Sequence, residues 1–321
     1  MKNTDCPLNN LPNEVLEILF RNIHYTRDRM NILRACANDF ENYGRIIDAC
    51  KDAVYLFDYH YHDLKESDYP LVHDLKTVVY DDFVIGHTFR NDWLIAWRGV
   101  ENISLTGWSG ISDEALEHLA GVRSINLSQT HGYTGRGIMA LKGVEEIYLD
   151  HCRTIPNRAI RALAGVRIIH MAENDRLTDK TVIALALGGV EEIFVPQCNR
   201  LTDKSLQALG CVNVRKIDLS RTTGFTSTGL RYLKGIHTVY LQKCQWVADD
   251  GLEALSGVQR LDISGCDNVS DKGFLTLLGV KHVSIRGCYR ISSAAVSVIR
   301  SQAKNVDEDA GQFCFADLLL F

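Results

Sequence analysis

The 321-residue sequence has little proline, methionine or tryptophan, with five, four and four residues of each. It also has no low-complexity run of the kind that indicates extended disorder. No apolar run approaches the roughly 18 residues of a membrane-spanning helix, and the N-terminal MKNTDCPLNN lacks the apolar core of a signal peptide. We therefore expect an intracellular protein of the cytoplasm, the nucleus or both, with no membrane partner.

A surplus of positive charge is also missing. The formal net charge is −5, and residues 75–321 hold 27 acidic and 27 basic side chains. Proteins that bind nucleic acid carry a basic stripe or patch that neutralises phosphates. The charge balance therefore predicts no nucleic-acid partner.

Motifs for catalysis are absent. The glycines of residues 132–137 lack the Lys-Ser/Thr of a phosphate-binding loop, and no G-x-S-x-G or H-E-x-x-H motif occurs. His60 and His62 have a spacing that can chelate a metal, but no thiolate or second pair accompanies them. We expect a protein that is not an enzyme and needs no cofactor or metal, with a cryptic enzyme as a distant alternative.

What the sequence does contain is a repeat. Residues 100–301 form nine units spaced by 22 residues, except for two steps of 24. The units begin at Val100, Val122, Val144, Val166, Val190, Val214, Ile236, Val258 and Val280. A fixed period of this size indicates a solenoid, in which each unit buries its apolar face against its neighbours.

Each unit reads as a strand followed by a helix. Apolar residues three and five places after the start, such as Ile103 and Leu105, flank one polar residue, which is the pattern of a strand with one buried face. Later, pairs at i, i+3 such as Leu116 and Leu119 predict a short helix. Ser/Thr-Asp pairs are typical of its beginning, and a glycine follows nearly every helix.

Five of the ten cysteines occupy one column of the repeat, namely Cys152, Cys198, Cys244, Cys266 and Cys288. Stacked neighbours could come within disulfide distance. Small buried thiols in a reducing compartment are the favoured interpretation, since no secretory signal is seen. The pattern V-x-x-I-x-L-x-x-C-x-x-L-T-D-x-x-L-x-x-L resembles the cysteine-containing class of leucine-rich repeats. That resemblance implies an α/β solenoid with parallel strands on the concave face and short helices outside.

The N-terminal residues, before the array, do not follow the repeat pattern. PLNNLPNEVLEILFRNI predicts a helix that starts near Pro12 and carries an apolar stripe, and two further helices are expected before residue 57, the last from about residue 43 to residue 56. Leu11-Pro12 and Glu14-Val15-Leu16 resemble the start of an F-box. The segment lacks the Trp and basic residue that usually follow the Cys of that motif. A plain helical cap for the solenoid is the alternative interpretation.

We therefore expect four regions. Residues 1–56 form an all-α F-box-like domain, 57–99 a linker and irregular coil closed by Phe89, Trp93 and Trp97, 100–301 the nine repeats, and 302–321 a C-terminal cap or tail. The residues of 57–99 that align with the strand columns are Leu75, Val78 and Tyr80.

The exposed strand positions of the array suggest a binding surface. Tyr148, His170 and Phe194 occupy the central exposed column in consecutive units, and Asp218 and Tyr240 continue it. Aromatic side chains in a row are typical anchors for a protein partner. The alternative is that aromatics favour strands and stack across them.

The combined resemblance is to F-box/leucine-rich-repeat receptors of SCF-type ubiquitin ligases. It implies that the N-terminal helices bind the Skp adaptor of a cullin–RING ligase, through Leu11, Pro12, Val15, Ile18 and Leu19. It also implies that the concave face binds a protein substrate. A leucine-rich-repeat scaffold without a ligase role remains the alternative.

Overall fold

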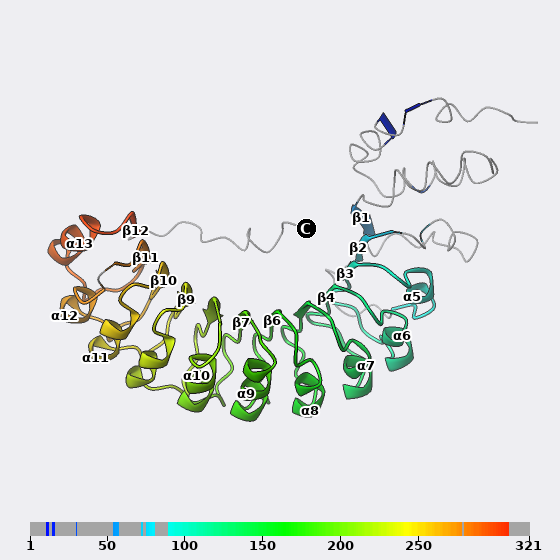
Figure 1. Cartoon of the computed structure of the whole chain (residues 1–321), viewed down its shortest axis with the longest axis horizontal. Coiled ribbons are helices and arrows are strands. Elements are labelled where there is room, and N and C mark those ends of the chain that lie inside the picture. The colour runs from blue at the N-terminus through cyan, green and yellow to red at the C-terminus, as the bar shows by residue number, and fades with distance from the viewer. Residues whose placement is uncertain are drawn as a thin grey trace, which may run out of the picture. The chain divides into compact units, whose positions relative to one another are not determined.

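The computed structural model describes residues 11–12, 15–16, 30, 54–57, 72, 75–80, 89–277 and 279–307. The chain divides into two compact units, residues 1–144 and 145–321, which we describe one at a time. Within each unit the chain forms successive coils, each a short strand followed by a short helix, with the strands on one side and the helices on the other (Figure 1). The predicted α/β leucine-rich-repeat solenoid is confirmed.

Unit 1 contains four parallel strands in sequence order. These strands are β1 (Val54–Phe57), β2 (Thr77–Tyr80), β3 (Asn102–Ser104) and β4 (Ser124–Asn126). Its described helices are α5 (Trp93–Ala96), α6 (Asp113–Glu117) and α7 (Gly135–Ala140). The helix predicted as far as residue 56 is wrong for its last residues, because Val54–Phe57 is a strand paired with β2. The β-branched and aromatic residues of VYLF suit a strand, and the edge of β2 supplies hydrogen bonds that the local pattern cannot foresee.

A cluster of aromatic rings forms the core beside β2. Phe89, Trp93 and Trp97 are at most 3% exposed, as predicted. The Tyr80 ring lies 5.1 Å from Trp93 and 4.6 Å from Trp108 between centroids. The Trp108 indole Nε1 also donates a hydrogen bond to the Tyr80 carbonyl, at 2.6 Å. The segment before the repeats is therefore packed as a coil of the same kind.

Unit 2 contains eight parallel strands in sequence order. They are β5 (Glu146–Tyr148), β6 (Ile168–His170), β7 (Glu192–Phe194), β8 (Lys216–Asp218), β9 (Thr238–Tyr240), β10 (Arg260–Asp262), β11 (His282–Ser284) and β12 (Asn305–Asp307). The segment after residue 301, expected to be a C-terminal cap or tail, thus adds one more strand at Asn305–Asp307. Residues 308–321 lie outside the described part.

The helices of unit 2 are short and follow the strands one by one. They are α8 (Asn157–Arg161), α9 (Asp179–Leu187), α10 (Asp203–Leu209), η3 (Ser227–Leu233), α11 (Asp249–Leu252), η4 (Glu253–Leu255), α12 (Asp271–Phe274) and α13 (Ser293–Arg300). Strands repeat at about 4.8 Å whereas packed helices need about 8–10 Å, so such a stack curves with its strands inside. None of the helices in the described ranges is both long and apolar enough to cross a bilayer.

The predicted apolar columns form the cores of both units. Every residue of the opening column, the two strand columns and the paired helix positions is at most 6% exposed. In β5, for example, Ile147 is fully buried while Glu146 and Tyr148 are partly exposed. Alternation along a strand turns neighbouring side chains to opposite faces. The strands therefore present their remaining side chains on one continuous surface within each unit.

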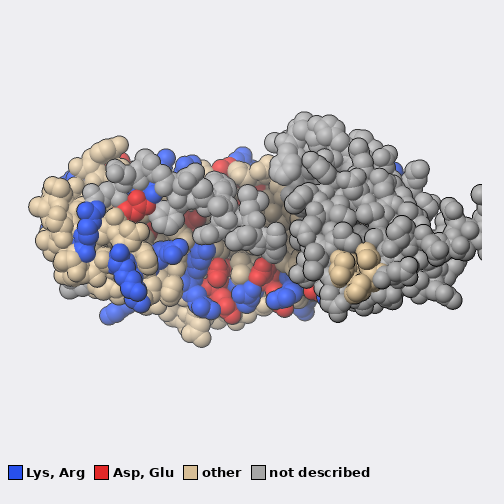
Figure 2. Space-filling view, turned by 90° about the horizontal axis from the view of Figure 1, so that it is seen from above, with Lys and Arg blue, Asp and Glu red and all other residues tan. Residues whose placement is uncertain are grey.

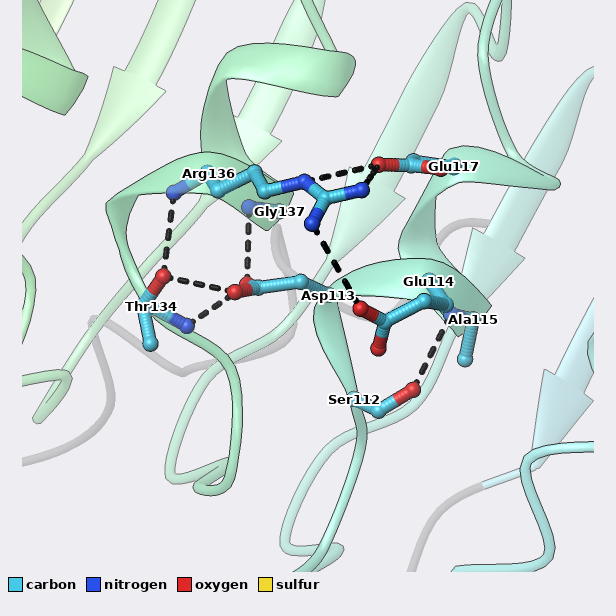
Figure 3. Close-up of polar contacts among 8 residues, drawn as sticks. All are labelled: Ser112, Asp113, Glu114, Ala115, Glu117, Thr134, Arg136 and Gly137. Atoms are coloured by element: carbon cyan, nitrogen blue, oxygen red, sulfur yellow. Dashed lines mark hydrogen bonds and ion pairs between the residues drawn. The ribbon is translucent and has the colours of Figure 1, made fainter.

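An aspartate ladder, which the sequence analysis treated only as helix caps, joins consecutive coils. Ser112 caps α6 by accepting a hydrogen bond from the Ala115 amide, as predicted. The next residue, Asp113, accepts hydrogen bonds from the amide and hydroxyl of Thr134 in the following coil, at 2.7 and 2.6 Å (Figure 3). Burial raises the pKa of Asp113, but the bonds from Thr134 and Gly137 outweigh it and leave that pKa below its usual value.

The same arrangement recurs in unit 2. The Asp–Ser/Thr pairs there are Asp179–Thr202, Asp203–Thr226, Asp249–Ser270 and Asp271–Ser292. In each pair the aspartate of one coil accepts from both the amide and the hydroxyl of the next. The repeated Ser/Thr-Asp motif thus sets the spacing between coils as well as the start of each helix.

The cysteine column holds free, buried thiols that act as hydrogen-bond donors. Cys198, Cys244 and Cys266 each donate to a carbonyl of the preceding coil, with sulfur–oxygen distances of 3.0 to 3.1 Å. Asn174, in the same column, donates to the Leu149 carbonyl at 3.0 Å. The column therefore selects small donors that satisfy a buried carbonyl.

We expect these thiols to be chemically inert. Burial raises the pKa of Cys198 to about 12 and that of Cys244 to about 11, and the thiolate is the reactive form. Cys211, in contrast, is exposed. We expect titration with a thiol reagent at neutral pH to detect one fewer fast-reacting thiol in Cys211→Ser than in the unmodified protein. The number should be unchanged in Cys244→Ser. Rapid labelling that disappears in Cys244→Ser would contradict this geometry.

Candidate functional site

The strand face of unit 2 brings the five predicted binding residues together. Tyr148, His170, Phe194, Asp218 and Tyr240 end the strands β5 to β9 and lie in register with one another. All are on the side of the strands that faces away from the buried isoleucine column. The structure thus places the predicted residues on one surface, in the predicted order.

The aromatic residues form a tight stack. The ring centroids of Tyr148 and His170 are 4.4 Å apart at an interplanar angle of 28°. Those of His170 and Phe194 are 3.8 Å apart at 11°. His170 is only 8% exposed, so the expected row of solvent-facing rings is wrong at this position. Parallel strands hold neighbouring side chains so close that the outer rings cover the middle one.

Burial in the stack sets the charge state of these rings. It lowers the pKa of His170 to about 3, with a further contribution from the positive charge of Lys216. Burial also raises the pKa of Tyr148 to about 12, helped by the carboxylates of Glu146 and Glu192. Both rings are therefore neutral at physiological pH, and the stack offers partly exposed, uncharged ring edges at Tyr148 and Phe194.

Lys216 extends the stack, and the sequence analysis did not single it out. Its Nζ lies 4.9 Å from the Phe194 ring centroid and 5.7 Å from that of Tyr240. This geometry is a cation–π contact with two rings. Lys216 belongs to the neighbouring exposed column, so only the lean of its side chain along the strands brings it between the aromatics. The face therefore carries a positioned positive charge between two half-buried rings.

Asp218 is largely engaged in its own turn. Its carboxylate accepts a hydrogen bond from the Ser220 amide at 2.8 Å, and Asp262 does the same with the Ser264 amide at 2.9 Å. Burial raises the pKa of Asp218, although the bonds from Ser220 oppose this. The carboxylate at 218 thus fixes the end of its strand, and any contact that it makes with a partner is additional to that role.

A left-handed turn follows each of these strands. The residue before the cysteine column has φ between 55° and 61° in six coils, at Gln129, His151, Glu173, Gln197, Arg221 and Lys243. Glycine occupies this position at Gly265 and Gly287. A side chain in the left-handed region costs about 1–2 kcal/mol relative to the right-handed one. The turn accepts glycine, so the side chains at 221 and 243 are present in spite of that cost.

Some side chains at this turn position are held by ion pairs and hydrogen bonds, and others are exposed. Glu173 forms an ion pair with Arg153 at 2.9 Å, lies 3.1 Å from the His151 ring and accepts a hydrogen bond from Gln197. Arg221 and Lys243 are exposed and form no ion pair with any residue in the described ranges. The edge of the strand face thus carries a polar network around Glu173 and, further along the stack, the exposed cations Arg221 and Lys243.

The strand face ends in a shallow pocket. It is lined by Tyr240, Arg260, Asp262, His282, Ser284 and Asp307, among others. Arg260, which hydrogen-bonds the Tyr240 side chain, joins it to the aromatic stack. The pocket is small, at about 250 Å³, so it suits a side chain of a partner better than a buried small-molecule ligand.

The predicted adaptor-binding residues are described in part. The amides of Val15 and Leu16 both bond to the Pro12 carbonyl at 3.1 Å, so a helical turn begins there, as predicted. Leu16 is 1% exposed whereas Val15 is 38% exposed, and Leu11 and Pro12 are also accessible. Ile18 and Leu19 lie outside the described residues.

The repeats and their stacked strands define the fold as a leucine-rich-repeat solenoid. No protein-family profile matches the sequence, and no curated protein does. Among solved structures, the chain is similar to one in the crystal structure of the yeast Rad7–Elc1 complex, at 13% identity and a TM-score of 0.48, over 88% of this chain and 90% of that one.

Two further solved structures show a weaker likeness. One is in a complex of Latrophilin 3, Unc5D and the leucine-rich repeats of FLRT2, at 14% identity and a TM-score of 0.42, over 74% of this chain and 85% of that one. The other is the leucine-rich-repeat domain of the type III effector XopL, at 12% identity and a TM-score of 0.28, over 95% of this chain and 97% of that one. Likenesses of this size carry no functional assignment.

Proposed function

We propose that this protein is a non-catalytic recognition subunit of an SCF-type ubiquitin ligase. Its N-terminal helices would bind the Skp adaptor of the cullin–RING complex, and its strand face would hold a protein substrate. The observation that carries the proposal is the accessible Leu11, Pro12 and Val15 at the start of a helical turn whose next residue, Leu16, is buried. This turn offers an apolar contact beside an anchored side chain, where the F-box resemblance places the adaptor.

In this role the chain positions the substrate and does not itself catalyse a reaction. A substrate held on the strand face has a raised effective concentration near the conjugating enzyme of the complex. The half-buried rings of Tyr148 and Phe194 and the cations beside them suit protein recognition. The proposal places the protein inside the cell, in the cytoplasm or nucleus, and gives it no cofactor.

Co-purification with a Skp adaptor tests the ligase link. We expect a Leu11→Ser, Val15→Asp variant to lose at least about tenfold in adaptor affinity, because truncating buried apolar anchors of an interface costs about 2 kcal/mol or more. A matched control is Met139→Ser, Leu187→Ser, since both side chains are exposed, at 51% and 80%, and lie in the repeats. The control should retain the adaptor, and thermal unfolding should show both variants folded.

The second candidate is a leucine-rich-repeat scaffold that has no ligase role. It is favoured by the β1–β2 pairing, which extends the coil pattern into the N-terminal region in the manner of a cap. An unmodified chain that never retains the adaptor, or a variant that retains it undiminished, would leave the scaffold as the function.

A further inference from the structure

The charges of the strand face in unit 2 are segregated along the stack. The strand and turn of each coil run from its opening position, or from residue 145 where unit 2 begins, to its helix cap. Residues 145–156, 166–178 and 190–202 hold seven acidic and four basic side chains. Residues 214–226, 236–248, 258–270 and 280–292 hold three acidic and eight basic ones. Figure 2 shows Lys and Arg gathered towards the left, over the C-terminal coils, with Asp and Glu beside them nearer the middle. The neutral average of residues 75–321 hides this division.

The cations of the two halves also differ in their pairing. In the acidic half, Arg167 pairs with Glu146 and lies 3.9 Å from Glu191. In the basic half Arg286 pairs with Asp307. Over the described ranges, no carboxylate forms an ion pair with Lys216, Arg221 or Lys243. These three lie on the neighbouring coils of β8 and β9 and leave a positive surface without a partner of its own.

The positions of these cations are held by the fold. Lys216 lies over the rings of Phe194 and Tyr240. Arg221 and Lys243 sit in the left-handed turn, with φ of 59° and 56°. Gly265, in the same turn of the next coil, leaves room for the Lys243 side chain, whose Cγ would lie 3.0 Å from an added Cβ. The strand and the turns thus set where the backbone presents these three cations.

We propose that the basic half of this face, centred on Lys216, Arg221 and Lys243, binds an extended acidic segment of a partner protein. The proposal rests on the strand face being a protein-binding surface, as proposed above. The rings of Phe194 and Tyr240 lie beside Lys216, so apolar residues of the partner would flank its acidic run. A long polyanion such as nucleic acid fits less well, because along the stack it meets the seven carboxylates of the neighbouring coils.

Four coils at about 4.8 Å match an acidic run of about six extended residues. The probe is therefore a fluorescent peptide of two leucines and a phenylalanine followed by about six glutamates. The control peptide has glutamine in place of each glutamate. We expect the full-length protein to bind the glutamate peptide at least about tenfold more tightly in fluorescence anisotropy. Added salt should narrow the difference.

Two variants locate the site. The double variant Arg221→Glu, Lys243→Glu should lower the affinity for the glutamate peptide at least about tenfold. The matched control, Arg158→Glu, Lys180→Glu, makes the same charge change on exposed cations of α8 and α9 and should stay within about twofold. In Arg221→Gly, Lys243→Gly, affinity should fall while the thermal midpoint does not, because glycine relieves the turn. That combination separates a binding role from a packing role.

The inference is wrong if the charge reversal leaves peptide affinity unchanged. It is also wrong if an oligonucleotide of equal charge binds as tightly as the peptide and responds to the same variants, since the face would then attract any polyanion. Adaptor capture is measured on the same proteins and should not change. If the unmodified protein captures the adaptor but does not prefer the glutamate peptide, only this inference is wrong. If it prefers the glutamate peptide but never captures the adaptor, only the ligase link is wrong.

Discussion

Replacing Gly251 by alanine is expected to lower the free energy of unfolding by about 2–4 kcal/mol, the range of a severe overpacking. Gly251 lies in α11, and a Cβ there would be 2.1 Å from the backbone oxygen of Ser227 and 2.5 Å from its hydroxyl. That hydroxyl bonds to the backbone of Ala248, at 3.1 Å to the carbonyl. Neither group can turn away, so neighbouring coils would have to separate. Urea-induced unfolding measures the loss.

Gly257 provides the matched control. Its φ is +84°, but an added Cβ would meet nothing within 4 Å. The Gly257→Ala variant therefore measures only the cost of a side chain in the left-handed conformation, which we expect to lower the free energy of unfolding by about 1–2 kcal/mol. If Gly251→Ala destabilises the protein no more than this control, the coils do not approach as closely as the structure has them.

Acidification should destabilise the protein through His170. Its pKa is lowered to about 3, first by burial and then by Lys216, whereas an unfolded histidine titrates near 6.5. Between these values the unfolded chain binds a proton that the folded chain does not, so stability falls as the pH drops below about 6.5. The slope is up to about 1.4 kcal/mol per pH unit, which gives roughly 3 kcal/mol near pH 4.

The His170→Phe variant isolates this contribution. Phenylalanine keeps a ring between Tyr148 and Phe194 but cannot titrate, so its stability relative to the unmodified protein should rise as the pH falls. The comparison is needed because Asp218 acts in the opposite sense. Burial raises the pKa of its carboxyl, so the folded state gains a proton first on acidification. Urea unfolding curves of the two proteins that shift in parallel from neutral to acidic pH would refute a buried neutral His170.

Much of the fold follows from periodicity in the sequence. Ile147 and Leu149 flank Tyr148 in β5, and the alternation alone tells which side chains are buried. The glycine after a helix, such as Gly143 with φ of 95°, marks a left-handed end that few other residues adopt. These features are local, because each depends on residues a few places apart. The five residues predicted to bind a partner could be placed on one face for the same reason.

Other features depend on contacts between coils, which no local pattern encodes. Residues 54–56 are expected to end a helix, yet residues 54–57 pair with β2 because its edge offers hydrogen bonds. The stack of Tyr148, His170 and Phe194 buries its middle ring because parallel strands place each outer ring 3.8 to 4.4 Å from it.

The sequence by itself thus determined the coil, its buried columns and the surface on which partners are expected. The tertiary structure decided what that surface is like. Lys216 reaches the aromatic rings only because its side chain leans along the strands, and Gly251 is required only because Ser227 of the preceding coil lies against it. Which face of a strand a side chain occupies follows from its own neighbours in the chain. Its remaining exposure, its charge state and its freedom to bind follow from residues about 22 positions away.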